Sequence, residues 1–404
     1  MTFDARCLLA LLFALLLGGC PVLVPADDDD AANDDDSSLD DDDAADDDDA
    51  ADDDDAADDD DAADDDDAVD DDDAADDDDA ADDDDAADDD DAVDDDDAAD
   101  DDDAVGSAPD PSVAGGLGFS TSSGSYSSFD GSTIPIQIYT PAATGPFPVV
   151  VFSHGFQLSP ADYVSWGEHL ASWGYLAVFP DLPGSIIIPE THVDLAAHVG
   201  ALLDDIVANG STAGGTYGGA ANRASITLAG HSMGGKISLL LATTDSRPLG
   251  VFGVDPVDAG GGPLIGVTPD YPSVTPELMP QITVPLVLLG ETTNATGGLG
   301  GACAPAADNF QQYFQNASSP ALEIDVLGAN HMSFLDNPLC LSCLACPLGT
   351  DDPAISRALA QGKLVAFLKS EIEGDASFGP WLTGAEADGQ VTAGLITYQV
   401  ANGF

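Results

Sequence analysis

The stretch of sequence that decides the fold is Gly230-His231-Ser232-Met233-Gly234-Gly235. It follows residues 225–229, which have strand character, and precedes residues 236–242, which have helix character. A G-x-S-x-G pattern between a strand and a helix is typical of a nucleophile elbow. Gly230 and Gly234 let neighbouring backbone pass without Cβ clashes, and the helix N-terminus favours a developing negative charge. We therefore expect Ser232 to be a catalytic nucleophile.

Apolar runs and helical periodicities alternate on both sides of this turn. Strands are expected at 133–139, 148–153, 175–179, 225–229, 251–255, 285–289 and 322–327, and helices at 161–173, 192–208, 236–242 and 354–372. This alternation predicts an α/β fold with a mostly parallel, doubly wound sheet. The tail 376–404 contains strand-like pieces that the pattern does not place.

The charge of the chain is strongly asymmetric. Its 404 residues include 78 acidic and only 7 basic side chains, and 51 of the acidic ones lie between Asp27 and Asp103. The rest still has a net charge of about −20, and such a surface repels phosphate backbones. Nucleic acid is therefore not an expected partner.

The first 19 residues resemble an export signal, with Arg6 followed by the apolar run 8–17, which is too short to span a bilayer. Residues 17–20, Leu-Gly-Gly-Cys, resemble a bacterial lipobox. We expect a cell-envelope lipoprotein attached to a membrane through a lipid on Cys20. An ordinary cleaved signal and a secreted protein are the alternative.

Residues 20–124 are expected to form a disordered segment. A six-residue repeat, Ala-Ala-Asp-Asp-Asp-Asp, is regular from 40 to 105, and adjacent carboxylates favour an extended chain. A Ser-, Gly- and Pro-rich linker follows to 124. The preferred interpretation is a solvated spacer. The more specific alternative is weak Ca²⁺ binding, since Ca²⁺ prefers carboxylate oxygens. The catalytic domain is then expected at 125–404.

A serine nucleophile needs a histidine base and an orienting acid. In a sheet of this kind their order along the chain is Ser, acid, His. His331 alone among the six histidines follows a late strand, in the loop 328–334, and is the expected base. Asp255, at the end of the strand after the elbow helix, is the preferred acid; Asp258 and Glu291 remain alternatives.

The oxyanion of an acyl-transfer intermediate needs two backbone N–H donors. One is expected from Met233, directly after the nucleophile. The other is expected from Phe156, in His154-Gly155-Phe156, which follows the buried strand 148–153.

Several of these stretches together resemble the chlorophyllase family of α/β-hydrolases. They are Val150 to Phe156, Gly230 to Lys236, Gly253 to Asp258, Cys303-Ala304-Pro305 and the late Gly-x-x-His. The resemblance covers about 146–337 and implies an α/β-hydrolase fold in which the first aspartate of Asp-Pro-Val, Asp255, is the triad acid. Cutinase-like polyester hydrolases and platelet-activating-factor acetylhydrolases are similar at the same positions. The chain differs at Met233, where plant chlorophyllases usually have arginine.

Four cysteines remain after the leader: Cys303, Cys340, Cys343 and Cys346. The Cys-x-x-Cys-x-x-Cys spacing could indicate a metal or cluster site. In an exported protein an even cysteine count favours two disulfides, with three possible pairings. We expect them to hold the loop that carries His331.

These observations predict a serine esterase or lipase that cleaves carboxylic esters of apolar substrates without a cofactor or metal. Within enzymes, the alternative is a chlorophyllase or a cutinase-like polyester hydrolase. From another class, the alternative is a non-catalytic surface protein whose acidic segment binds cations.

Overall fold

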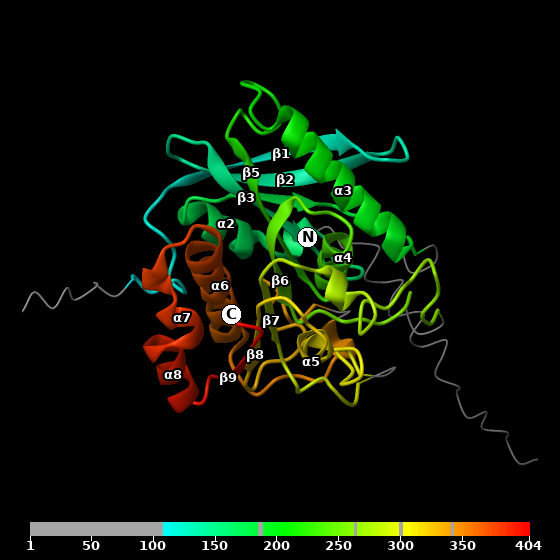
Figure 1. Cartoon of the computed structure of the whole chain (residues 1–404), viewed down its shortest axis with the longest axis vertical. Coiled ribbons are helices and arrows are strands. Elements are labelled where there is room, and N and C mark those ends of the chain that lie inside the picture. The colour runs from blue at the N-terminus through cyan, green and yellow to red at the C-terminus, as the bar shows by residue number, and fades with distance from the viewer. Residues whose placement is uncertain (1–107, 185–188, 262–264, 299–301, 341–342) are drawn as a thin grey trace, which may run out of the picture. The chain divides into compact units, whose positions relative to one another are not determined.

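One mixed sheet runs through the part of the chain that the computed structural model describes, which is residues 108–184, 189–261, 265–298, 302–340 and 343–404 (Figure 1). The expected export signal, Cys20 and the acidic repeat lie outside these residues. The strands are β1 (Phe119–Ser127), β2 (Thr133–Pro141), β3 (Phe147–Ser153), β4 (Leu176–Pro180), β5 (Ala221–His231), β6 (Pro248–Val254), β7 (Leu286–Gly290), β8 (Ala321–Val326) and β9 (Ile396–Ala401).

The strand order is β1-β2-β4-β3-β5-β6-β7-β8-β9. The six central strands, from β4 to β8 in this order, are parallel, while β1, β2 and β9 pair antiparallel at the two edges. Central strands such as β3 and β7 are almost entirely apolar and buried, as expected for a sheet covered on both faces. The predicted mostly parallel α/β sheet is confirmed.

Helices connect the strands and cover both faces of the sheet (Figure 1). They are α2 (Val164–Ser172), α3 (His192–Asn209), α4 (Met233–Ala242), α5 (Phe310–Gln315), α6 (Pro353–Phe367), α7 (Pro380–Thr383) and α8 (Ala385–Thr392). Shorter turns are η1 (Pro160–Asp162), η2 (Met279–Gln281), η3 (Cys343–Ala345), η4 (Leu368–Ile372) and η5 (Ala376–Phe378). Both long helices begin at side-chain caps: Thr191 accepts the N–H of Asp194 in α3, and Asp352 accepts that of Ala354 in α6.

The core forms two clusters of buried apolar side chains. One lies under α3, α4 and α5, where the helical spacing of Leu195, Val199 and Leu202 puts them on one buried face. The other lies under α2 and α6 and contains Trp166, whose indole N–H also donates to the carbonyl of Phe334 at 2.9 Å. Burial on both faces fixes the carboxyl ends of the central strands, which is where the site lies.

Both ends of the folded region differ from what the sequence patterns suggested. Strand β1 begins at Phe119, N-terminal to the expected boundary at 125. The sequence pattern did not mark it as a strand, because an edge strand rich in Ser has the composition of a linker. The unplaced tail forms α7, α8 and β9, and β9 pairs antiparallel with β8. Among the described residues, no helix combines the length and apolar character needed to cross a bilayer.

Candidate active site

Ser232 lies on a strained turn between β5 and α4. Its φ is +56° and its ψ is −122°, in a region that non-glycine residues rarely adopt. A Cβ on Gly234 would lie 2.1 Å from the carbonyl oxygen of Ser153, and one on Gly230 would lie 2.5 Å from Gly234. Only glycine fits at these two positions. The strand, sharp turn and helix expected around Ser232 are therefore present.

Three of the predicted residues meet at the carboxyl ends of the strands. The Nε2 atom of His331 lies 2.9 Å from the Ser232 hydroxyl, and its Nδ1 lies 2.6 Å from Oδ2 of Asp255. Asp255 directly follows β6 and has a φ of +43°, while His331 lies in the loop after β8. The carboxylate accepts the Nδ1 proton, so Nε2 is the nitrogen that can accept a proton from Ser232.

Burial sets the charge state of this group. His331 and Asp255 are both buried. Burial lowers the pKa of His331 to about 4, so the imidazole is neutral at neutral pH and can act as a base. Burial, together with the nearby Asp325, raises the pKa of Asp255 well above its usual value, while hydrogen bonds from Glu291 oppose that rise.

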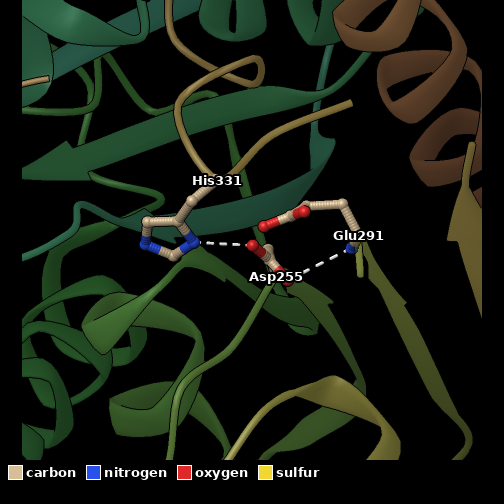
Figure 2. Close-up of side chains that lie close together, drawn as sticks. All are labelled: Asp255, Glu291 and His331. Carbon is tan, nitrogen blue, oxygen red and sulfur yellow. Dashed lines mark hydrogen bonds and ion pairs between the residues drawn. The ribbon is translucent and has the colours of Figure 1, made fainter. Parts of the chain in front are cut away.

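The two alternative acids have hydrogen-bond partners other than the His331 imidazole. Asp258 belongs to a different cluster: it lies 3.2 Å from the buried ammonium of Lys236 and accepts the backbone N–H groups of Val274 and Thr275. Glu291 follows β7 and lies beside Asp255, to whose Oδ1 its backbone N–H donates at 3.3 Å (Figure 2). Of the three carboxyl groups, Asp255 is the one hydrogen-bonded to His331.

The two residues expected to supply oxyanion donors line the same cavity as Ser232. Phe156 lies in the loop after β3, and Met233 is the first residue of α4, where a backbone N–H has no intrahelical acceptor. Both residues line one cavity of about 270 Å³ with Ser232. Apolar side chains on this cavity include Leu158, Leu182, Leu195 and Val257, and polar ones include His154, Gln157, Asp181, Glu190, His192 and Tyr271. The cavity next to the serine therefore has a mixed lining, in which aliphatic side chains lie beside two carboxyl groups.

The sequence did not predict a chain of hydrogen bonds between two loops. It joins the loop 154–156 after β3, here called the oxyanion loop, to the loop 328–334 that carries His331, here called the histidine loop. The N–H of Gly155 donates to the Tyr163 hydroxyl at 3.1 Å, and that hydroxyl lies 2.8 Å from Nδ1 of His231. Nε2 of His231 lies 2.9 Å from the carbonyl oxygen of His331. Because a carbonyl only accepts, Nε2 carries the proton and Nδ1 accepts from Tyr163. Burial keeps the pKa of His231 well below its usual value, so this arrangement persists at neutral pH.

Asn294 is a second residue that the sequence did not single out. Its Oδ1 accepts the backbone N–H of His331 at 2.9 Å, and its Nδ2 donates to the carbonyl of Pro347 at 3.0 Å. Asn330 donates to the same carbonyl at 2.8 Å. No local pattern marks these contacts, because they join segments far apart in the sequence.

The four cysteines form two disulfides, Cys303–Cys346 and Cys340–Cys343. Each sulfur is thus bonded to the sulfur of one other cysteine, and the four do not form a set of free thiol ligands for a metal. Cys346 immediately precedes Pro347, the residue that both asparagines contact. The position agrees with the expectation that a disulfide holds the histidine loop.

Comparison with known proteins identifies the family. Residues 120–379 match the family described as Chlorophyllase. Chlorophyllase-1 of Citrus unshiu is 32% identical over 257 residues, which cover 60% of this chain and 74% of that protein. Chlorophyllase-1 of Arabidopsis thaliana is 27% identical over 266 residues, covering 60% and 77%. A family match over more than half of the chain, on a mostly parallel sheet with a serine elbow, shows that this chain belongs to the chlorophyllase family of α/β-hydrolases.

Proposed function

We propose that the protein is a serine hydrolase that cleaves carboxylic esters of apolar substrates. The observation that carries the proposal is a pair of hydrogen bonds made by the His331 imidazole. Its Nε2 lies 2.9 Å from the Ser232 hydroxyl, and its Nδ1 lies 2.6 Å from Oδ2 of Asp255. A neutral, buried imidazole between a hydroxyl and a carboxylate has the geometry needed to activate a serine.

The proposed reaction uses these residues in two half-reactions. The Ser232 oxygen attacks the ester carbonyl while His331 takes its proton, and Asp255 stabilises the resulting imidazolium. The N–H groups of Phe156 and Met233 bind the negative oxygen of the tetrahedral intermediate. His331 then gives the proton to the departing alcohol. Water repeats the sequence on the acyl-enzyme and releases the acid.

The aliphatic side chains of the cavity support apolar esters as substrates, and its carboxyl groups Asp181 and Glu190, with the negative charge of the domain, support uncharged ones. Anionic esters should bind poorly, because a net charge of about −20 repels them at low salt. Chlorophyll is the more specific candidate, supported by the similarity to plant chlorophyllases. A polyester substrate is the other specific candidate, from the resemblance to cutinase-like enzymes.

The test combines covalent labelling with a substrate panel. Wild-type protein should react with a fluorophosphonate probe and hydrolyse p-nitrophenyl esters, and Ser232→Ala should lose both. Ser153→Ala is the matched control, because Ser153 is also buried near the elbow but its hydroxyl has no hydrogen-bond partner among the described residues. Equal labelling of wild type and Ser232→Ala would overturn the proposal and favour a non-catalytic surface protein. Parallel assays with chlorophyll and a polyester film distinguish the substrates.

We also propose that the protein is exported and tethered through a lipid on Cys20, with the acidic repeat as a spacer that binds Ca²⁺ at most weakly. The sequence pattern alone supports this part. Incorporation of a labelled fatty acid that is lost in Cys20→Ala tests the anchor. Deletion of residues 27–103 should leave turnover of a soluble ester unchanged, because the repeat has no apolar face to pack on the enzyme.

A further inference from the structure

Three carboxyl groups lie close together where β6, β7 and β8 end. Asp255 follows β6, Glu291 follows β7, and Asp325 lies in β8. Asp255 and Glu291 are fully buried, and each lies close enough to Asp325 for its charge to matter. Three adjacent negative charges in a buried site would repel one another strongly.

Hydrogen-bond donors are distributed unequally between the two buried carboxyls. Asp255 accepts from Nδ1 of His331 and from the N–H of Glu291. Glu291 accepts the N–H of Asn294 on Oε2 at 2.8 Å, whereas its Oε1 is buried and receives no donor from the described residues. Figure 2 shows the Glu291 carboxyl directed toward that of Asp255. One carboxylate oxygen of Asp255, one of Glu291 and one ring nitrogen of His331 lie within 4.8 Å of one another.

This arrangement is costly if both carboxyls are ionised. A buried carboxylate oxygen without a donor loses its hydration and gains nothing in return. A proton on Oε1 of Glu291 removes the repulsion and supplies the missing hydrogen bond. The proton belongs on Glu291 rather than Asp255, because both oxygens of Asp255 already accept N–H groups. Burial and the neighbouring Asp255 raise the pKa of Glu291 to about 9, and burial also raises the pKa of Asp255, so the placement of the donors decides which carboxyl holds the proton.

We propose that Glu291 is a positioning residue that carries a proton at neutral pH and donates an O–H···O bond to Asp255. The acid of the site is then a carboxylic acid–carboxylate pair with a single negative charge next to His331. Glu291 also holds the turn of Asn294, whose Oδ1 binds the backbone N–H of His331. It therefore orients both partners of the hydrogen bond between Asp255 and His331. The inference deepens the proposed function and rests on it for its kinetic consequence.

The charge state predicts a distinctive pH dependence. Loss of the Glu291 proton on the alkaline side adds a second negative charge, which repels Asp255 and displaces it from His331. Wild-type kcat should therefore fall as pH rises through about 9. The Glu291→Gln variant keeps a neutral donor toward Asp255 and an acceptor for Asn294. It should retain kcat at pH 7 within about threefold and lose this alkaline decline. Glu291→Leu should lower kcat far more than KM.

Two readouts do not depend on activity. An acid with a higher pKa in the folded than in the unfolded state binds more protons when folded, so its contribution to stability declines as pH rises from about 4.5 to about 9. Glu291→Gln should therefore gain in Tm relative to wild type as pH increases through this range. The infrared difference spectrum between wild type and Glu291→Gln at pH 7 should show the carbonyl band of a protonated carboxylic acid.

Glu323→Gln is the matched control. Glu323 is buried in β8, has a raised pKa and accepts a hydrogen bond from Gln399, away from the serine. This variant should keep the alkaline decline in kcat. The proposal is overturned if Glu291→Gln retains that decline and shows no pH-dependent gain in Tm, and if the infrared difference spectrum between wild type and variant shows no carboxylic acid band. Absence of any esterase activity in wild type would refute the proposed function alone, since the infrared and Tm measurements would still report the Glu291 proton.

Discussion

Replacing Asp255 by asparagine tests the assignment of the acid most directly. Oδ2 of Asp255 accepts the Nδ1 proton of His331 at 2.6 Å, and Oδ1 accepts the N–H of Glu291 at 3.3 Å. An asparagine has only one oxygen for these two donors. If its oxygen faces Glu291, its NH₂ group faces Nδ1, and the imidazole proton must move to Nε2. That tautomer cannot accept the proton of Ser232.

The opposite orientation of the amide is also unfavourable, because its NH₂ group would then face the N–H of Glu291 in a buried site. The loss should resemble that of the same substitution in a serine protease triad, roughly 10⁴-fold in kcat. This corresponds to about 5.4 kcal/mol of transition-state stabilisation. Steady-state hydrolysis of a p-nitrophenyl ester at pH 7 measures it, with circular dichroism to verify folding.

Asp258→Asn is the control, because it removes a carboxylate from the same loop that has a different partner. It leaves the buried ammonium of Lys236 without its anion, which should lower stability by roughly 3–5 kcal/mol. The kcat of the folded fraction should change little. If Asp255→Asn retains kcat within tenfold, or if folded Asp258→Asn loses more activity than Asp255→Asn, the reasoning is refuted.

Three further predictions concern other parts of the site. Tyr163→Phe removes the hydroxyl that links the oxyanion loop to the histidine loop. The kcat should fall on the order of 10-fold or more, as for a weakened oxyanion site, and an unchanged kcat would contradict this. Replacing Cys303 and Cys346 by serine removes a cross-link with a sequence separation of 43. The free energy of unfolding should fall by about 4 kcal/mol from the added chain entropy of the unfolded state. Denaturant unfolding measures this loss, and the variant should lose activity at a lower temperature than wild type. Burial lowers the pKa of His331 to about 4, so kcat/KM should persist as pH falls below 6 and decline only near pH 4. The free energy of unfolding should decrease from pH 6.5 downward, because the unfolded chain takes up the proton first. A midpoint for kcat/KM near 6.5 would show that the histidine is not desolvated.

The sequence alone determined the main elements of the fold and indicated Ser232 as the candidate nucleophile. Periodicity and apolar runs are local properties, so they located the central strands, α3 and α4. The glycines around Ser232 reported a backbone constraint that is also local. The chain order of serine, acid and histidine reduced the six histidines to His331. Local patterning was weakest at the sheet edges, where most residues of β1 and β9 are exposed or half-buried and so lack a strong apolar signal.

Only the tertiary structure decided which groups meet. Asp255 and Asp258 are three residues apart in one loop, yet one faces His331 and the other faces Lys236. The position of Asp255 at the strand end favoured it but did not exclude Asp258, since the outcome depends on where the ends of β6, β7 and β8 place the neighbouring segments. The disulfide pairing and the proximity of Glu291 to Asp255 have the same origin. These contacts arise because parallel strands bring segments distant in sequence to one edge of the sheet, where burial then fixes their charges and hydrogen bonds.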